Sequence, residues 1–156
     1  MKYRKVFGDE QLVIAERGTE KVVHILRSAI DVHRDDEDFI VVTIDVHNCY
    51  NSFHRDFMLQ AVKEKFPGLA RFTAWKYIKS IPLYLRNGKV ITSQSGGKQG
   101  DGLMGVCHGA ADLKIVEAIR SKFKIVTPSY ADDRYVAGHW SEVLEFFREL
   151  KPLCAA

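Results

Sequence analysis

The sequence predicts an α+β fold in which a small antiparallel sheet packs against helices in two layers. Short runs of β-branched and apolar residues alternate with segments whose apolar residues fall at helical spacing. Short turn signals separate some of these runs, which favours antiparallel pairing. The 156 residues, 46% of them hydrophobic and 28% charged, fit a single domain over 1–156.

A helix and a strand are predicted ahead of position 45. Thr19 is the expected cap of a helix that continues to about Val32. The run 39–44 is continuous and rich in β-branched residues, which is typical of a strand buried on both faces. It ends at Asp45, and a carboxylate there is costly to bury unless something pairs with it.

Two helices are predicted after position 50. Asn51 or Ser52 is the expected cap of a helix over 53–66, and a second helix is expected over 69–79. The aromatic residues of the second helix recur at helical spacing. We expect these to be core rather than a base-stacking surface: Phe72, Trp75 and Tyr77.

The second half of the chain predicts a hairpin, a loop and further alternating elements. An Asn-Gly pair at 87–88 is a strong turn signal between two short strands. A glycine-rich loop over 93–102 precedes a long helix, and Asp101 is a candidate cap for that helix. The remaining predicted elements are a strand over 123–127, a turn at 130–133, a strand over 134–137 and a helix over 141–150 that ends at Pro152.

Three carboxylates stand at positions that carry chemistry. Asp45 closes a strand, and Asp132 and Asp133 occupy a tight turn between two apolar strands. Neighbouring antiparallel strands would bring them together, where they repel each other unless cations neutralise them. Hard divalent ions with oxygen ligands, two Mg²⁺ or Mn²⁺, suit such a cluster and serve phosphoryl transfer. The simpler alternative is that Asp-Asp is a common turn sequence and that Asp45 is a helix cap.

The net charge and the cysteine content exclude few classes of function. Lys and Arg outnumber Asp and Glu by 23 to 20, which is compatible with a nucleic-acid partner without implying one. The three cysteines form no C-x-x-C pair, so we expect a reducing compartment. Without a secretory signal or an apolar run of membrane-spanning length, we expect an intracellular, soluble protein with no membrane partner.

Three segments resemble reverse-transcriptase motifs, in the order that family has them. The segment 42–53, with Asp45 followed by Tyr50, resembles motif A; the segment 95–101 resembles motif B; and the turn 130–133 resembles the aromatic-x-Asp-Asp motif C. The stretch 11–27 resembles the segment before motif A in non-LTR retrotransposon enzymes. The residues that also fit this branch, or the group II intron type, are Asn48, Asn51 and Arg55, and the resemblance covers 11–138.

The resemblance implies a polymerase palm and a role for each site residue. Asp45 and Asp132 would bind both metal ions, with Asp133 assisting and the backbone carbonyl of Val46 as a further ligand. Tyr50 would lie under the incoming sugar and select deoxynucleotides. The residues implied in holding the incoming nucleotide, the template base or the primer end are Gln99, Gly100 and Tyr130.

The implied function is RNA-directed DNA synthesis on an RNA template from a DNA or RNA primer and dNTPs. The motifs depart from the family at Gly102, where proline is usual, and at His108, where an apolar residue is usual. We expect the thumb to be absent and the fingers to be largely absent, so that this chain is a fragment of a longer polymerase. A catalytically inactive palm remnant that binds nucleic acid, or another palm-type nucleotidyltransferase, is the alternative.

Overall fold

The computed structural model describes residues 4–98 and 100–155, which belong to two compact units. The sheet unit comprises residues 1–46 and 112–156, and the insert unit comprises residues 47–111. Helix α6 (Met104–Ile119) contributes its first part to the insert unit and its last part to the sheet unit. Each unit is described by itself below.

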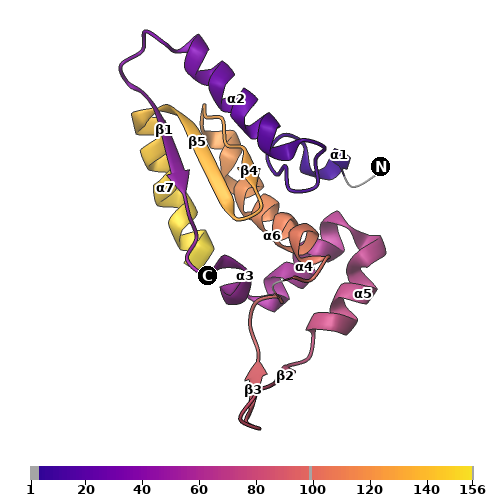
Figure 1. The fold of residues 1–156 in the computed structure, drawn as a ribbon. Helices are drawn as coiled ribbons and strands as arrows, with labels where there is room; N and C mark the ends of the chain where they lie inside the picture. The colour runs from indigo at the N-terminus through magenta and orange to yellow at the C-terminus, as the bar shows by residue number, and fades with distance from the viewer. Residues whose placement is uncertain (1–3, 99, 156) are drawn as a thin grey trace. The chain divides into compact units, whose positions relative to one another are not determined.

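The sheet unit is built on a three-stranded antiparallel sheet. Its strand order is β1 (Phe39–Ile44), β5 (Asp133–His139), β4 (Ser129–Tyr130), as Figure 1 shows. The register of the central pair runs from Phe39 opposite His139 to Ile44 opposite Arg134. The expected antiparallel sheet is therefore confirmed.

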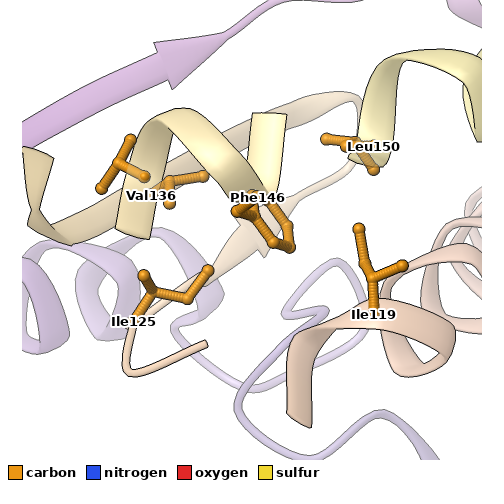
Figure 2. Close-up of a cluster of buried hydrophobic side chains, with 6 residues drawn as sticks. Ile119, Ile125, Val136, Phe146 and Leu150 are labelled. Carbon is orange, nitrogen blue, oxygen red and sulfur yellow. The ribbon is translucent and has the colours of Figure 1, made fainter. Parts of the chain in front are cut away.

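Helix α7 (Trp140–Ala155) and the last part of α6 cover one face of this sheet. Phe146 of α7 is completely buried, and its ring meets Phe123 edge-on with the ring centroids 5.8 Å apart. Burying a side chain of this size contributes roughly 1.5–3 kcal/mol. The cluster that fixes the helices to the sheet, shown in Figure 2, consists of Ile119, Ile125, Val136, Val143, Phe146 and Leu150.

Three shorter or peripheral elements complete the sheet unit. They are α1 (Arg4–Phe7), α2 (Gly18–Val32) and the single 3₁₀ turn η1 (Arg120–Lys122). Helix α2 lies against β4. The unit thus has the predicted α+β architecture, with a small antiparallel sheet packed against helices.

The insert unit contains helices and one hairpin. Its elements are α3 (Cys49–Ser52), α4 (Arg55–Lys65), α5 (Pro67–Tyr77), β2 (Ile81–Tyr84) and β3 (Val90–Ser93). Helices α4 and α5 pack against each other, and β2 pairs antiparallel with β3. The turn between the strands contains Gly88 with a positive φ of 79°, as an Asn-Gly hairpin signal predicts.

The caps predicted for the helices after positions 19 and 52 were wrong. Thr19 lies inside α2, which begins after Arg17 in a left-handed conformation (φ 54°). Asn51 and Ser52 belong to α3, and α4 begins after His54. In each case the backbone conformation that starts the helix is set without a capping side chain, so the preferred capping residue types gave no guide.

Three predicted elements differ in extent or burial. No strand occupies 123–127; only Val126 pairs there, with Ala137, because Phe123 and Ile125 supply core side chains from an irregular segment. Helix α7 continues through Pro152, since a proline near the end of a helix disrupts few hydrogen bonds. Strand β1 is covered on one face only, and Val41 on its other face is 41% exposed.

The aromatic residues of α5 do not share one environment. Tyr77 is completely buried, as expected, but Trp75 is 75% exposed and Phe72 is 50% exposed. The expectation of a common core was wrong for these two because α5 buries the face that carries Thr73 and Tyr77. The insert unit therefore presents aromatic surface to solvent.

Candidate functional site

The carboxylates predicted from the sequence lie at one end of the β1–β5 pair. Asp45 follows the last residue of β1, and Asp133 is the first residue of β5. Extending the register by one pair beyond Ile44 and Arg134 brings Asp45 opposite Asp133. Side chains alternate between faces along a strand, so both point away from the face that packs on α6 and α7, and both are exposed.

Asp132 lies in the turn that joins β4 to β5. Tyr130 pairs with Asp133, which leaves Ala131 and Asp132 as the two connecting residues. Ala131 has a left-handed φ of 56°, a conformation that is uncommon for a residue other than glycine. The structure therefore brings the three candidate carboxylates to one edge of the sheet unit, and Asp132 is only half-buried there.

The donors at this edge suit a hard divalent cation in kind. They are carboxylate oxygens, the donor type that Mg²⁺ and Mn²⁺ prefer, and Val46, directly after Asp45, is exposed. Within residues 4–98 and 100–155, no three His, Cys, Asp or Glu side chains gather closely enough to hold a metal ion. The backbone register brings two carboxylates, those of Asp45 and Asp133, opposite each other.

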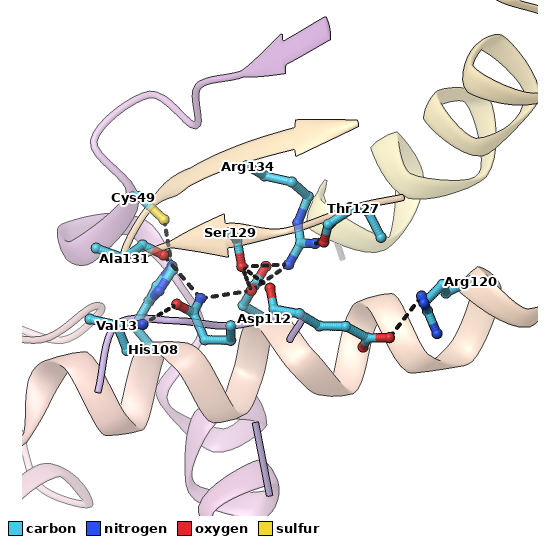
Figure 3. A network of polar contacts seen from close by, with 11 residues as sticks. Val13, Cys49, His108, Asp112, Arg120, Thr127, Ser129, Ala131 and Arg134 are labelled. Carbon is cyan, nitrogen blue, oxygen red and sulfur yellow. Dashed lines mark hydrogen bonds and ion pairs between the residues drawn. The ribbon is translucent and has the colours of Figure 1, made fainter. Parts of the chain in front are cut away.

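A buried polar network lies behind the acidic turn (Figure 3). Arg134, next to Asp133 on β5, is buried, and its Nη2 lies 2.5 Å from Oδ2 of Asp112 on α6. Its Nη1 donates to the carbonyl and to the hydroxyl of Thr127 at 3.0 and 2.9 Å. Ser129 on β4 also donates to Asp112 at 3.2 Å. Strand β5 is thus tied to α6 by an ion pair that the core almost encloses.

Gln11 connects this network to the turn itself. Its side-chain amide donates to Asp112 at 3.0 Å and to the backbone carbonyl of Ala131 at 3.2 Å. Its side-chain oxygen accepts a hydrogen bond from the backbone N–H of Val13 at 3.2 Å. The conformation of the residue before Asp132 is therefore held by a buried amide from the N-terminal segment.

Sequence reasoning missed this support. Nothing local marks Arg134 as buried, because its partner Asp112 is 22 residues away along the chain and Gln11 lies 101 residues from Asp112. The one available signal is a basic residue directly after two acids at the start of an apolar strand. Strand alternation then puts Arg134 on the face opposite to Asp133.

Tyr130 packs against the start of α2. A Cβ atom built on Gly18 would lie 3.0 Å from the Cε2 atom of the Tyr130 ring and 2.2 Å from the carbonyl oxygen of Leu12. A side chain at position 18 would therefore collide with both groups. This close approach fixes the ring that precedes the acidic turn.

Two other predicted site residues, Tyr50 and Gly100, belong to the insert unit, and Gln99 lies outside the described residues. Tyr50 is half-buried, and its carbonyl accepts a hydrogen bond from the N–H of Gly97 at 2.6 Å. Gly100 has a positive φ of 82° and open space around it.

Two glycines of the loop allow it to approach α3 and α6 closely. Gly96 has a φ of 61°, and a Cβ atom there would lie 2.3 Å from the backbone carbonyl carbon of Asn51. A Cβ atom on Gly97 would lie 2.0 Å from Cε of Met104. Both positions need glycine because backbone or side-chain atoms of the protein come this close.

Arg55 holds the same loop from α4. Its guanidinium donates to the carbonyls of Gly96 at 2.8 Å, Ser93 at 3.0 Å and Ser95 at 3.1 Å, and to the Ser93 hydroxyl at 2.8 Å. Arg55 is buried. Its five fixed donors match a curved run of carbonyls, which a flexible ammonium group does not do.

Asp101 ends the loop and caps the turn that leads into α6, which is the role expected of it. Its carboxylate accepts hydrogen bonds from the N–H of Leu103 at 3.1 Å and from the hydroxyl of Tyr77, and it pairs with Lys76 at 2.6 Å. Burial acts to raise the pKa of Asp101, but the hydrogen bonds from Lys76 and Tyr77 outweigh it, and the pKa lies below its usual value. Burial and the bond to Asp101 raise the pKa of Tyr77.

Comparison with solved structures identifies the class of fold. The chain is similar to a structure described as apo telomerase from Candida tropicalis, truncated from its C-terminal domain, with a TM-score of 0.60 and 9% sequence identity. The likeness covers 99% of this chain and 35% of the other, so the chain spans about a third of that protein's length. The sheet with its helices is thus an α+β arrangement consistent with a palm-like fold.

The other comparisons add no family. No protein-family model matches the chain, and no curated protein matches it in sequence. Among the residues described, no helix combines the length and the apolar composition needed to cross a bilayer.

Proposed function

We propose that the chain is the catalytic palm segment of an RNA-directed DNA polymerase of the non-LTR retrotransposon or group II intron type. It would transfer a nucleotide from a dNTP to the 3′-hydroxyl of a DNA or RNA primer on an RNA template. The observation that carries the proposal is the pair of exposed carboxylates, Asp45 and Asp133, at facing strand ends beside the Asp132 turn. The palm-like fold gives this arrangement its context.

In this proposal the chain's own residues hold and orient the reactants. Asp45, Asp132 and Asp133, with the carbonyl of Val46, would hold two Mg²⁺ or Mn²⁺ ions. Such ions, when bound, neutralise charge on the reacting phosphate and activate the attacking hydroxyl. Like charges that face each other across two strands destabilise a sheet, so the bare fold itself favours a cation at this edge.

The remaining residues would select and position the substrates. Tyr50 would meet the sugar of the incoming nucleotide and exclude a 2′-hydroxyl, and Tyr130 would pack beneath the primer end. Gln99 and Gly100 would lie near the incoming nucleotide and the template base. Each of these roles rests on the motif resemblance.

The test is calorimetric titration of Mn²⁺ into the wild type, Asp132→Asn and Asp35→Asn. Asp35 is an exposed carboxylate in the acidic loop before β1, so it is a matched control for loose attraction of cations. Binding that is lost in Asp132→Asn and kept in Asp35→Asn supports the site. Binding that survives Asp132→Asn and is lost in Asp35→Asn assigns the ions to the loop and refutes it. Templated incorporation of a dNTP by the wild type, absent in Asp132→Asn, then tests the reaction.

A nucleic-acid-binding domain without chemistry is the second candidate. The insert unit carries nine Lys and Arg against three Asp and Glu, so nine minus three gives it a formal charge of +6. Arg86 and Lys89 flank the hairpin turn, and Tyr84 on β2 is 79% exposed. Such groups contact phosphates and stack on bases. RNA binding by fluorescence anisotropy that persists in Asp132→Asn, with no dNTP incorporation by the wild type, would favour this candidate.

A further inference from the structure

A thiol and an imidazole lie in direct contact within the insert unit. The Sγ atom of Cys49 is 2.9 Å from Nε2 of His108, although the two residues are 59 positions apart (Figure 3). His108 is buried on α6, and Cys49 is partly exposed at the start of α3. A cysteine within hydrogen-bonding reach of a base, with access to solvent, is the arrangement that activates a sulfur nucleophile.

The fold holds both partners of this pair in place. Asn48, directly before Cys49, has a left-handed φ of 52°, and its side chain accepts a hydrogen bond from Asn51 at 2.6 Å. The hydroxyl of Ser52 donates to the Asn48 carbonyl at 2.8 Å. The imidazole of His108 packs against the ring of Tyr50, with the ring centroids 5.0 Å apart. The hydrogen-bonded turn holds Cys49 in place, and the contact with Tyr50 holds the imidazole of His108, so the geometry of the Cys49–His108 contact is fixed.

We propose that Cys49 is a reactive thiol, with His108 as its base, and that it is a site of covalent modification by small carbon electrophiles. The thiol proton moves to Nε2 of His108, and the Sγ electron pair forms a bond to the electrophilic carbon. With iodoacetamide the carbon–iodine bond breaks, iodide leaves, and the product is an S-carbamidomethyl cysteine. The imidazole of His108 on α6 faces the sulfur, and the ring of Tyr50 on α3 packs against that imidazole.

The other two cysteines give the chain its own reference thiols. Cys107 is buried, and burial raises the pKa of its thiol to about 11, which suppresses the thiolate. Cys154 is exposed near the end of α7, and partial burial of its sulfur raises the pKa of its thiol. Cys107 therefore reports reaction through unfolding, and Cys154 reports reaction of an accessible thiol without such a base.

The experiment measures iodoacetamide labelling of each cysteine by peptide mass spectrometry at pH 7. For the wild type we expect Cys49 to react at least about tenfold faster than Cys154, because only a few per cent of an ordinary thiol is ionised at this pH and the raised pKa of Cys154 lowers that fraction further. In His108→Gln we expect the Cys49 rate to fall about tenfold while the Cys154 rate stays the same. Equal rates at Cys49 and Cys154 in the wild type would overturn the proposal, as would an unchanged Cys49 rate in the variant.

A second measurement covers the case in which His108→Gln fails to fold, which fast labelling of Cys107 would reveal. The labelling rate of wild-type Cys49 is then followed from pH 5 to pH 10. We expect it to level off below about pH 8.5, the ordinary pKa of a thiol, because the imidazole takes the proton. A profile that levels off at or above about pH 8.5 would overturn the proposal. None of these readouts requires polymerase activity, so they test the thiol separately from the proposed function.

Discussion

Replacing Arg134 by methionine removes the charge that holds β5 to α6 while keeping a long apolar side chain. Arg134 is 4% exposed and forms hydrogen bonds to Thr127, Ser129 and Asp112. Without it, the carboxylate of Asp112, which is 19% exposed, keeps the donors from Gln11 and Ser129 among the residues that the structure describes. Leaving one partner of a buried pair uncompensated costs about 3–5 kcal/mol.

The loss is measured as a change in the midpoint of thermal unfolding followed by circular dichroism. In a chain of this size each kcal/mol lowers the midpoint by roughly 2–4 °C, so Arg134→Met should lower it by about 6–20 °C. The matched control is Arg148→Met. Arg148 pairs with Glu145 on the surface of α7, where the two side chains are 62% and 56% exposed. Such a pair contributes less than about 1 kcal/mol.

A loss in Arg134→Met no larger than the loss in Arg148→Met would refute the role given to the network. The double variant Arg134→Met with Asp112→Leu separates the two sources of the effect. Replacing both partners of a buried pair by apolar residues is often close to neutral. The double variant should therefore recover much of the stability, and a further loss of stability would show that packing around Arg134, rather than its charge, dominates.

The remaining predictions concern the insert unit, and thermal unfolding measures each of them. Gly96→Ala should lower the free energy of unfolding by at least about 1–3 kcal/mol because of the positive φ and the Asn51 contact. Its control is Gly68→Ala, which has open space and no positive φ and should raise the free energy of unfolding by up to about 1 kcal/mol. Equal effects of the two substitutions would contradict this account. Arg55→Lys should lose about 1–3 kcal/mol for each carbonyl left without a donor, and an unchanged midpoint would contradict the clamp. Because the pKa of Asp101 is lowered in the folded chain, its contribution is present at neutral pH and disappears as the pH falls below about 4. Asp101→Asn should therefore be less stable than the wild type at pH 7 and match it near pH 2, whereas a constant difference would contradict the lowered pKa.

The sequence predicted elements well where local pattern and final structure coincide. The run 39–44 became β1 with the predicted bounds because its β-branched residues are flanked by charged ones. The Asn-Gly turn and the helix-starting role of Asp101 depend on a few adjacent residues and are confirmed. Asp45 and Asp133 also lie at the ends of β1 and β5, and the β1–β5 register agrees with the alternating burial along the two strands.

The predictions failed where the outcome depends on distant parts of the chain. The apolar run 123–127 reads as a strand, but its residues are apolar because Phe123 and Ile125 enter the core from an irregular segment. Trp75 has the helical spacing of a core residue, yet α4 covers a different face of α5. Periodicity gives the direction of a side chain from its helix and does not say what lies there.

The buried network and the acidic edge both result from the alternation of side chains between the two faces of β5. Asp133 and Arg134 are neighbours in β5, so they point to opposite faces of the sheet. The carboxylate reaches solvent beside Asp45, whereas the guanidinium reaches Asp112 on the helix side. The positive charge next to the acids is therefore neutralised from behind and is not available to pair with them. The turn that carries Asp132 is held from behind through the hydrogen bond from Gln11 to the Ala131 carbonyl.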